Sequence, residues 1–224
     1  MSNLSSVARL ACAFLLIGMS ATNPLARLEA YSDGIFAIAS TLLVLEIRVP
    51  TVGLDAPASE LWRRLAELWP SYLAFALSFG TILIMWVNHH SALQLLNRTS
   101  KPFIYANGLL LLAVTFVPFP TALLARYFDT EFAAVAVVSY SAYALLTNVV
   151  FVLWGLSMQR PVHLFKPEVD RAKITDMNRK SRLGLLVYVL TTAVSWWLPA
   201  LGLALIIALY AFWASMSVTI ATET

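Results

Sequence analysis

Long apolar stretches, separated by short polar segments, are the strongest constraint on the fold of this chain. A helix needs about 20 consecutive apolar residues to cross the hydrocarbon layer of a bilayer. The sequence holds six candidate stretches, at about residues 27–47, 72–96, 103–124, 132–156, 183–198 and 201–220. Because these stretches and their loops account for nearly all of the 224 residues, we predict an all-α membrane protein with six transmembrane helices per subunit.

The composition argues against several other classes of protein. Hydrophobic residues make up 60% of the chain and charged residues 12%, with a mean hydropathy of +0.77, whereas soluble domains are about a quarter charged. The single cysteine, Cys12, cannot form an internal disulfide or a thiolate cluster. The sequence also has no recognisable catalytic triad, zinc-protease motif or phosphate-binding loop. We therefore expect neither an enzyme nor a protein with a cofactor.

The N-terminal region does not fit the six-helix pattern. Residues 10–21 form an apolar run that is too short to span a membrane. Such a run is typical of a signal peptide, of an interfacial lead-in helix, or of a chance apolar stretch translated from an upstream start codon; we favour the last two. We divide the chain into residues 1–26, an interfacial or disordered segment, and residues 27–222, a single six-helix transmembrane domain. Residues 59–68 are amphipathic and are expected to lie in the membrane interface.

The distribution of Lys and Arg predicts the orientation of the six helices. Four basic residues fall on one side of the membrane: Arg48, Arg63, Arg64 and Arg126. Eleven fall on the other: Arg9, Arg27, Arg98, Lys101, Arg160, Lys166, Arg171, Lys173, Arg179, Lys180 and Arg182. Basic loops stay in the cytoplasm, so we place both termini and the loop at residues 160–182 there, in the inner (plasma) membrane of a cell. The positive charge then reports topology and contact with membrane lipid, and we expect no nucleic-acid partner.

The first span carries ionisable residues that lipid alone does not accommodate, because buried charges need protein or water around them. At 100° per residue, two stripes separate on this helix. Glu29, Asp33 and Ser40 form a polar stripe that needs partners within the protein. A second stripe, about a quarter-turn away, is apolar apart from one hydroxyl and contains Gly34, Ile38, Thr41 and Leu45. Its spacing alone favours ordinary helix packing.

The second span offers donors for the acidic stripe. Trp86 and His90 lie four residues apart on one face, and both an indole and an imidazole donate hydrogen bonds to carboxylates. We predict that Trp86 or His90 holds Asp33. Because neighbouring helical residues point about 100° apart, His89 and His90 do not suggest a metal site. Both also fit histidines at a helix end near the interface.

Several of these residues closely resemble the transmembrane protein 175 family of lysosomal potassium channels, and within it the bacterial members with one six-helix repeat. The similarity lies in Arg27, in residues 31–34 and 37–47, and in Trp86 with the two histidines after it. The chain differs in Tyr31, where phenylalanine is usual, and in the apolar extension before Arg27. Neither difference touches the second stripe.

The resemblance implies a potassium-permeable channel without a cofactor, in which the first helices of a homotetramer surround the path of monovalent cations. Matched by position, the pore-lining residues are Ile38, Thr41, Leu42 and Leu45, with an apolar constriction at Ile38 and transient K⁺ near the Thr41 ring. A hydrogen-bonded network of Arg27, Ser32, Asp33, Trp86 and His90 would fix the pore helix. This favours pore lining over packing for the second stripe. It also implies passive K⁺ conduction of modest selectivity.

A secondary transporter is the main alternative. It would use the buried Asp33 and His90 as a relay for protons or cations. Transporters commonly show internal repeats or interrupted helices. The sequence has no evident repeat, although Pro118 and Pro120 predict a kink in the third span.

Overall fold

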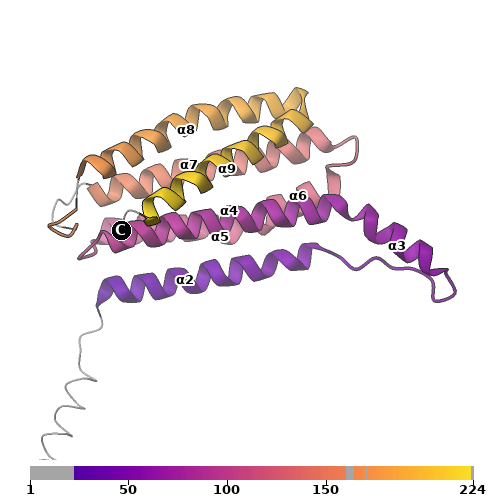
Figure 1. The fold of residues 1–224 in the computed structure, drawn as a ribbon, viewed down its shortest axis with the longest axis horizontal. Helices are drawn as coiled ribbons and strands as arrows, with labels where there is room; N and C mark the ends of the chain where they lie inside the picture. Colours follow the sequence, from indigo (N-terminus) through magenta and orange to yellow (C-terminus); the bar gives the residue numbers. More distant parts are fainter. Residues whose placement is uncertain (1–22, 160–163, 170, 223–224) are drawn as a thin grey trace, which may run out of the picture.

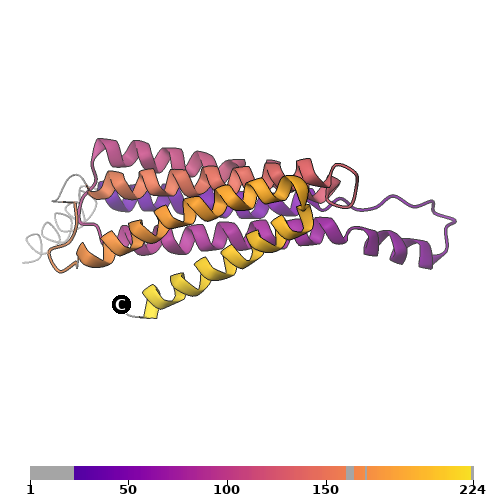
Figure 2. The same cartoon turned by 90° about the horizontal axis from the view of Figure 1, so that it is seen from above.

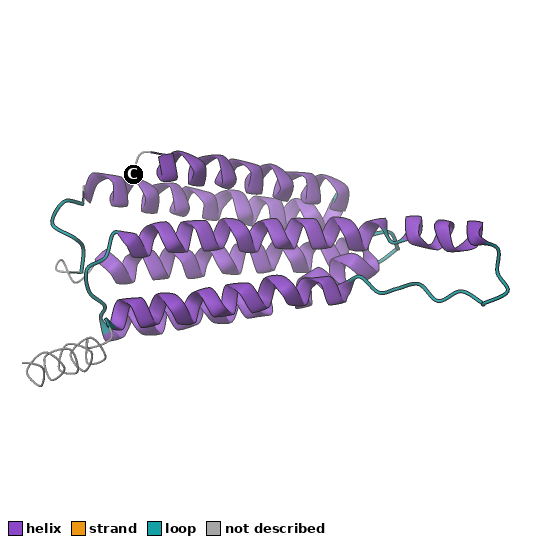
Figure 3. Ribbon diagram, turned by 60° about the horizontal axis from the view of Figure 1, so that its bottom comes forward, coloured by secondary structure: helices purple, strands orange, loops and turns teal. Residues whose placement is uncertain are grey.

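The computed structural model describes residues 23–159, 164–169 and 171–222, and shows them as helices joined by loops (Figure 3). The helices run side by side, with one short helix projecting beyond the bundle (Figure 1). The apolar run at residues 10–21, for which a signal peptide or an interfacial helix was considered, lies outside the described residues.

The first span consists of α2 (Pro24–Leu42) and a 3₁₀ turn, η1 (Leu43–Glu46). Asn23 precedes the helix and accepts a hydrogen bond from the backbone N–H of Leu25 at 3.0 Å. Pro24 then occupies the first turn, where its missing N–H is not needed. The helix therefore begins three residues before the position predicted from hydropathy, in a turn that is set by capping and not by apolar content.

Helix α3 (Ala58–Glu67) lies beyond the end of the bundle (Figure 1), and none of its residues is buried. Glu60 pairs with Arg63 at 2.6 Å and with Arg64 at 3.0 Å. Hydrogen bonds from these two guanidinium groups hold the pKa of Glu60 below its ordinary value. The amphipathic helix predicted at residues 59–68 is present, with its charges neutralised along one face.

The next three spans form the centre of the bundle. They are α4 (Trp69–Gln94), the pair α5 (Lys101–Phe116) and α6 (Pro118–Tyr127), and α7 (Ala133–Gln159). The α5–α6 break falls at Val117, directly before Pro118, where the proline ring has no N–H to continue the helix. This agrees with the kink expected from the two prolines.

Two further helices close the bundle: α8 (Arg171–Trp197) and α9 (Pro199–Thr222). The sequence predicted a loop through residue 182, and this was wrong from Arg171 onward. Lys, Arg and Asn lower hydropathy without preventing a helix, and Asp176 pairs with Lys180 one turn later at 2.7 Å. Helix α9 slants away from the other helices toward its C-terminal end (Figure 2).

Four of the described helical segments are long and apolar enough to cross a membrane: Pro24–Glu46, Trp69–Gln94, Lys101–Tyr127 and Ala133–Gln159. The apolar part of α9, Pro199–Ser215, is shorter, and the first third of α8 is charged. The protein is thus all-helical, with four spans that meet the length and hydropathy criteria in the described part of the chain.

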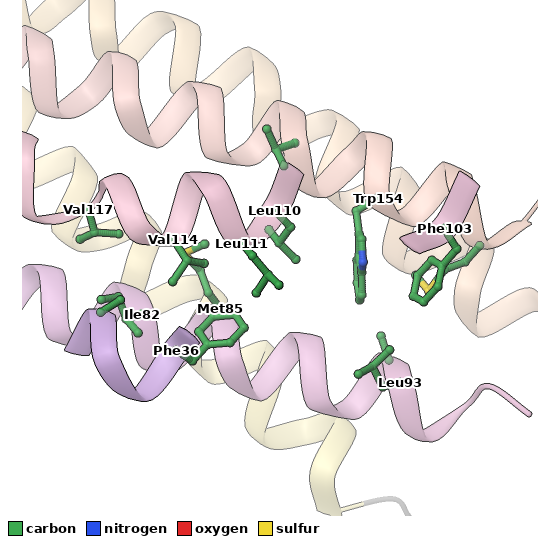
Figure 4. Packing of buried hydrophobic residues seen from close by; sticks show 14 of the residues in the cluster. Phe36, Ile82, Met85, Leu93, Phe103, Leu110, Leu111, Val114, Val117 and Trp154 are labelled. Carbon is green, nitrogen blue, oxygen red and sulfur yellow. The ribbon is translucent and has the colours of Figure 1, made fainter. Parts of the chain in front are cut away.

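The core places α2 against α4 and α5. Phe36 of α2 is buried beside Met85 of α4, and Leu111 and Val114 of α5 belong to the same apolar cluster (Figure 4). Trp154 of α7 closes this cluster from the other side. At the end of the bundle where α2 begins, the α4–α5 loop pairs with the α7–α8 connection through a hydrogen bond from the N–H of Asn97 to the carbonyl of Leu164 at 2.7 Å.

Candidate functional site: the first helix and its hydrogen-bonded supports

Helix α2 has one buried face and one face that no other described element covers. Ser32, Phe36 and Ala39 are buried, whereas Ile38 is 60% exposed. Thr41, Leu42 and Leu45 are exposed on the same side as Ile38. The four residues expected to line a pore therefore lie together on the open face of the protomer.

The Thr41 hydroxyl has a defined orientation on this open face. Its proton is donated to the carbonyl of Ile38 in the same helix, at 2.9 Å. A hydroxyl oxygen keeps two lone pairs when its proton is donated. The oxygen of Thr41 thus remains able to accept a hydrogen bond or contact a cation, while the helix satisfies its proton.

The acidic stripe of α2 faces α4 through two parallel pairs. The indole Nε1 of Trp86 donates to Oδ1 of Asp33 at 2.9 Å. One turn away, Nδ1 of His90 lies 3.2 Å from Oε1 of Glu29. The rings of Trp86 and His90 stack with their centroids 5.4 Å apart. The structure therefore brings Asp33 together with Trp86, and it pairs His90 with Glu29 instead of Asp33.

A second, fully buried cluster ties α2 to the other helices. Asn107 of α5 donates through Nδ2 to the hydroxyl of Ser32 at 3.0 Å. Its carbonyl oxygen accepts from Nε2 of His89 at 2.8 Å and from the indole of Trp154 at 3.2 Å. His89 also stacks on Trp154, with ring centroids 5.3 Å apart. One amide thus joins side chains from α2, α4 and α7.

Sequence reasoning placed Ser32 in a network but missed Asn107 and Trp154, and left His89 as a candidate interfacial histidine. The structure buries His89 completely. The available signal was Asn107 itself, a lone amide within the apolar run of the third span, because a buried amide needs partners. Spacing on one helix does not reveal which residues of other helices supply them.

Two predicted polar residues lie outside both clusters. Arg27 is exposed, and no side-chain hydrogen bond or ion pair joins it to the other residues that the structure describes. Ser40 donates to the carbonyl of Phe36 in its own helix at 2.7 Å. Across residues 23–159, 164–169 and 171–222, no three His, Cys, Asp or Glu side chains gather as metal ligands.

These features define a multi-pass membrane protein whose first helix is fixed by buried hydrogen bonds and open on its opposite face. Residues 27–118 match the model of the family described as endosomal/lysosomal potassium channel TMEM175. A potassium channel of Chamaesiphon minutus is 44% identical over 193 residues, covering 82% of this chain and 91% of the relative. The chain belongs to the TMEM175 family.

Two further comparisons agree with this membership. A potassium channel of Streptomyces collinus is 40% identical over 183 residues, covering 81% of this chain and 87% of the relative. The crystal structure of a lysosomal potassium-selective channel TMEM175 homolog from Chamaesiphon minutus superimposes with a TM-score of 0.76. It is 42% identical and covers 86% of this chain and 97% of that one. The similarity thus extends well beyond the segment matched by the family model.

The Asn107 cluster predicts a stability change. In Asn107→Leu, the amide is lost while Ser32, His89 and Trp154 stay buried without it. Leaving buried donors unpaired costs about 1–3 kcal/mol each, so the variant should unfold at a clearly lower temperature in detergent. Thr115→Ala on the same helix is the control, since Thr115 is exposed and its hydroxyl bonds only within its own helix, to Leu112. Equal melting temperatures for the two variants would contradict a supporting role for Asn107.

Proposed function

We propose that the chain forms a potassium-permeable cation channel in which α2 from each of four identical subunits lines a central pore. Family membership supports the transport class. The observation that carries the assignment of the pore is the open face of α2, where Ile38, Thr41, Leu42 and Leu45 project away from every other described helix of the protomer.

The chemistry of this face suits a narrow pore of mostly apolar character. Four copies of Ile38 would form an apolar ring, and such constrictions gate by losing water. One turn along, four Thr41 oxygens would offer lone pairs to a partly dehydrated K⁺ ion. Leu42 and Leu45 would continue the apolar wall. With one hydroxyl ring and no carboxylate in the path, the selectivity for K⁺ over Na⁺ would be modest.

The opposite face would hold the pore helix in place. Asp33 accepts from Trp86, and Ser32 accepts from Asn107, so these two polar groups are directed into the protomer and away from the proposed ion path. Glu29 and His90 would add an ion pair whenever the imidazole is protonated. Arg27, exposed at the start of the helix, would find its partner in a neighbouring subunit or in lipid headgroups.

The proposed arrangement in the membrane has six spans, with the apolar part of α8 and all of α9 added to the four long ones. Both ends of the described chain, the α4–α5 loop and the start of α8 lie at one end of the bundle (Figure 1). This is the end rich in Lys and Arg, so we assign it to the cytoplasm and the protein to the inner (plasma) membrane. The homotetramer would then conduct cations across this membrane.

A secondary transporter is a second candidate, favoured by the interruption between α5 and α6 at Val117. It would use Asp33 and His90 to carry protons or cations. In the protomer both side chains have close partners, Asp33 in Trp86 and His90 in Glu29. A relay through them would have to break these contacts in each cycle, whereas a passive pore leaves them intact.

Planar bilayer recording of the purified full chain separates the two functions. A channel should give discrete current steps that grow with driving force and reverse near the K⁺ equilibrium potential in a K⁺ gradient. The same recording in gradients of Na⁺, Cs⁺ and pH would rank the permeant ions. Currents absent in every gradient, together with K⁺ uptake into liposomes only when a counter-ion gradient is present, would refute the channel and support the transporter.

The apolar constriction predicts the effect of one substitution. Ile38→Asn should raise the single-channel conductance several-fold, because a ring of amides keeps water in a passage that four isoleucines exclude. Ile38→Leu is the matched control and should conduct like the wild type, since it keeps an apolar side chain of equal size. If Ile38→Asn and Ile38→Leu carry the same single-channel current, the constriction lies elsewhere.

The threonine ring predicts a change in ion preference. Thr41→Ala removes four oxygens from the proposed path, so the reversal potential in opposed K⁺ and Na⁺ solutions should move toward zero. Thr41→Ser keeps the oxygens and should preserve the wild-type value. A reversal potential that is unchanged in Thr41→Ala would remove Thr41 from ion selection, even if the current itself were smaller.

A further inference from the structure

A cavity of about 110 Å³ lies between α4, α7, α8 and α9, and its lining residues include none from α2. Its lining residues from α9 are Tyr210 and Trp213, and α9 slants away from the remaining helices toward its C-terminal end (Figure 2). A single water molecule needs only about 10–15 Å³ of such space, and an engineered cavity of about 150 Å³ holds a benzene molecule. The space is therefore large enough for several waters or for one small organic molecule.

The cavity walls are aromatic and uncharged. Phe151 and Trp154 of α7, Tyr188 of α8 and Tyr210 of α9 all contribute to them, and the lining residues include no acidic or basic side chain. Burial of a charge without a partner is costly, so this environment excludes ions and charged amines. It favours a neutral ligand with a flat apolar body, because aromatic rings gain energy from ring contacts.

The buried polar atoms of the lining that have no hydrogen-bond partner include the acceptor Oδ1 of Asn148 and the hydroxyl of Tyr210. The hydroxyl protons of Thr81 and Thr147 are donated to the carbonyls of their own helices, at 2.8 and 2.9 Å, so these hydroxyls can enter further hydrogen bonds only as acceptors. A buried acceptor without a partner costs stability. A ligand that brings one donor would therefore satisfy Asn148.

We propose that this cavity is a binding site for a small uncharged phenol: one aromatic ring that carries a hydroxyl group. The ring fills the space between the aromatic side chains, and the hydroxyl donates to Oδ1 of Asn148. Water molecules alone would satisfy the acceptor but would leave the aromatic walls wet. A hydrocarbon ring alone would fill the space between the aromatic walls but would leave Oδ1 of Asn148 without a hydrogen bond.

Fluorine NMR on the full chain in detergent tests this, with 4-fluorophenol and fluorobenzene as probes and with empty micelles subtracted. In the wild type, 4-fluorophenol should bind saturably and more tightly than fluorobenzene. Asn148→Leu keeps the volume and removes the acceptor. It should weaken the affinity for 4-fluorophenol about five- to tenfold, as expected for the loss of one neutral hydrogen bond. The affinity for fluorobenzene should change less than about twofold. Equal effects on the two probes would overturn the role of Asn148.

A pair of variants on α7 distinguishes binding of the probes in the cavity from their uptake into the detergent micelle. Ala144→Leu fills the cavity and should abolish saturable binding of both probes. Ala142→Leu makes the same chemical change at an exposed position of α7 and should bind like the wild type. Identical binding by these two variants would place the probes in detergent and refute the site.

If Ala144→Leu does not purify as a folded protein, Asn148→Leu and Thr81→Val still test the site. Thr81→Val removes another wall oxygen at constant volume, and it should bind both probes like the wild type, because the single hydroxyl proton of the ligand is donated to Asn148. Unchanged 4-fluorophenol binding in Asn148→Leu would show that no hydrogen bond to Asn148 selects the ligand.

Discussion

The fold depends on hydrogen bonds made where water is scarce. Asp33 and Ser32 lie on a helix that lipid or other helices surround, and an unpaired polar group there is costly. Both groups find donors on neighbouring helices, Trp86 on α4 and Asn107 on α5. Because such donors are directional, they fix the rotation of α2 as well as its distance from the bundle. Apolar packing around Phe36 adds contact area, but it defines the rotation of α2 about its axis less strictly than the hydrogen bonds do.

The sequence predicted one of these pairings and missed the other. The faces of a single helix follow from a period of 3.6 residues, so the polar stripe of α2 and the Trp86–His90 stripe of α4 could be derived. Which residue meets which depends on how far one helix slides along the other, and a shift by one turn exchanges partners. That is why His90, an equal candidate for Asp33, lies against Glu29. Asn107 belongs to a helix for which no stripe was derived.

Hydropathy was informative about environment but not about conformation. The four long apolar segments were located to within a few residues, since the bilayer sets their length. The charged stretch before residue 183 was assigned to a loop because its hydropathy is too low for the apolar layer, yet it is helical from Arg171. Lys and Arg are good helix formers, and the Asp176–Lys180 pair adds support within one turn. A helix can leave the apolar layer without ending.

The two faces of α2 are linked by geometry. Asp33 and Ile38 are five residues apart, which places them about 140° from one another around the helix axis. A slip of the Asp33–Trp86 contact by a single residue would turn the open face by about 100° and bring Ala39, now buried, toward the outside. It would also move Ser32 away from Asn107 and break the hydrogen bond from Nδ2 of Asn107 to the Ser32 hydroxyl. The two clusters therefore oppose rotation together, since α4 and α5 hold the same helix from different sides. The identity of the side chains on the open face is thus set by residues that do not themselves lie on it.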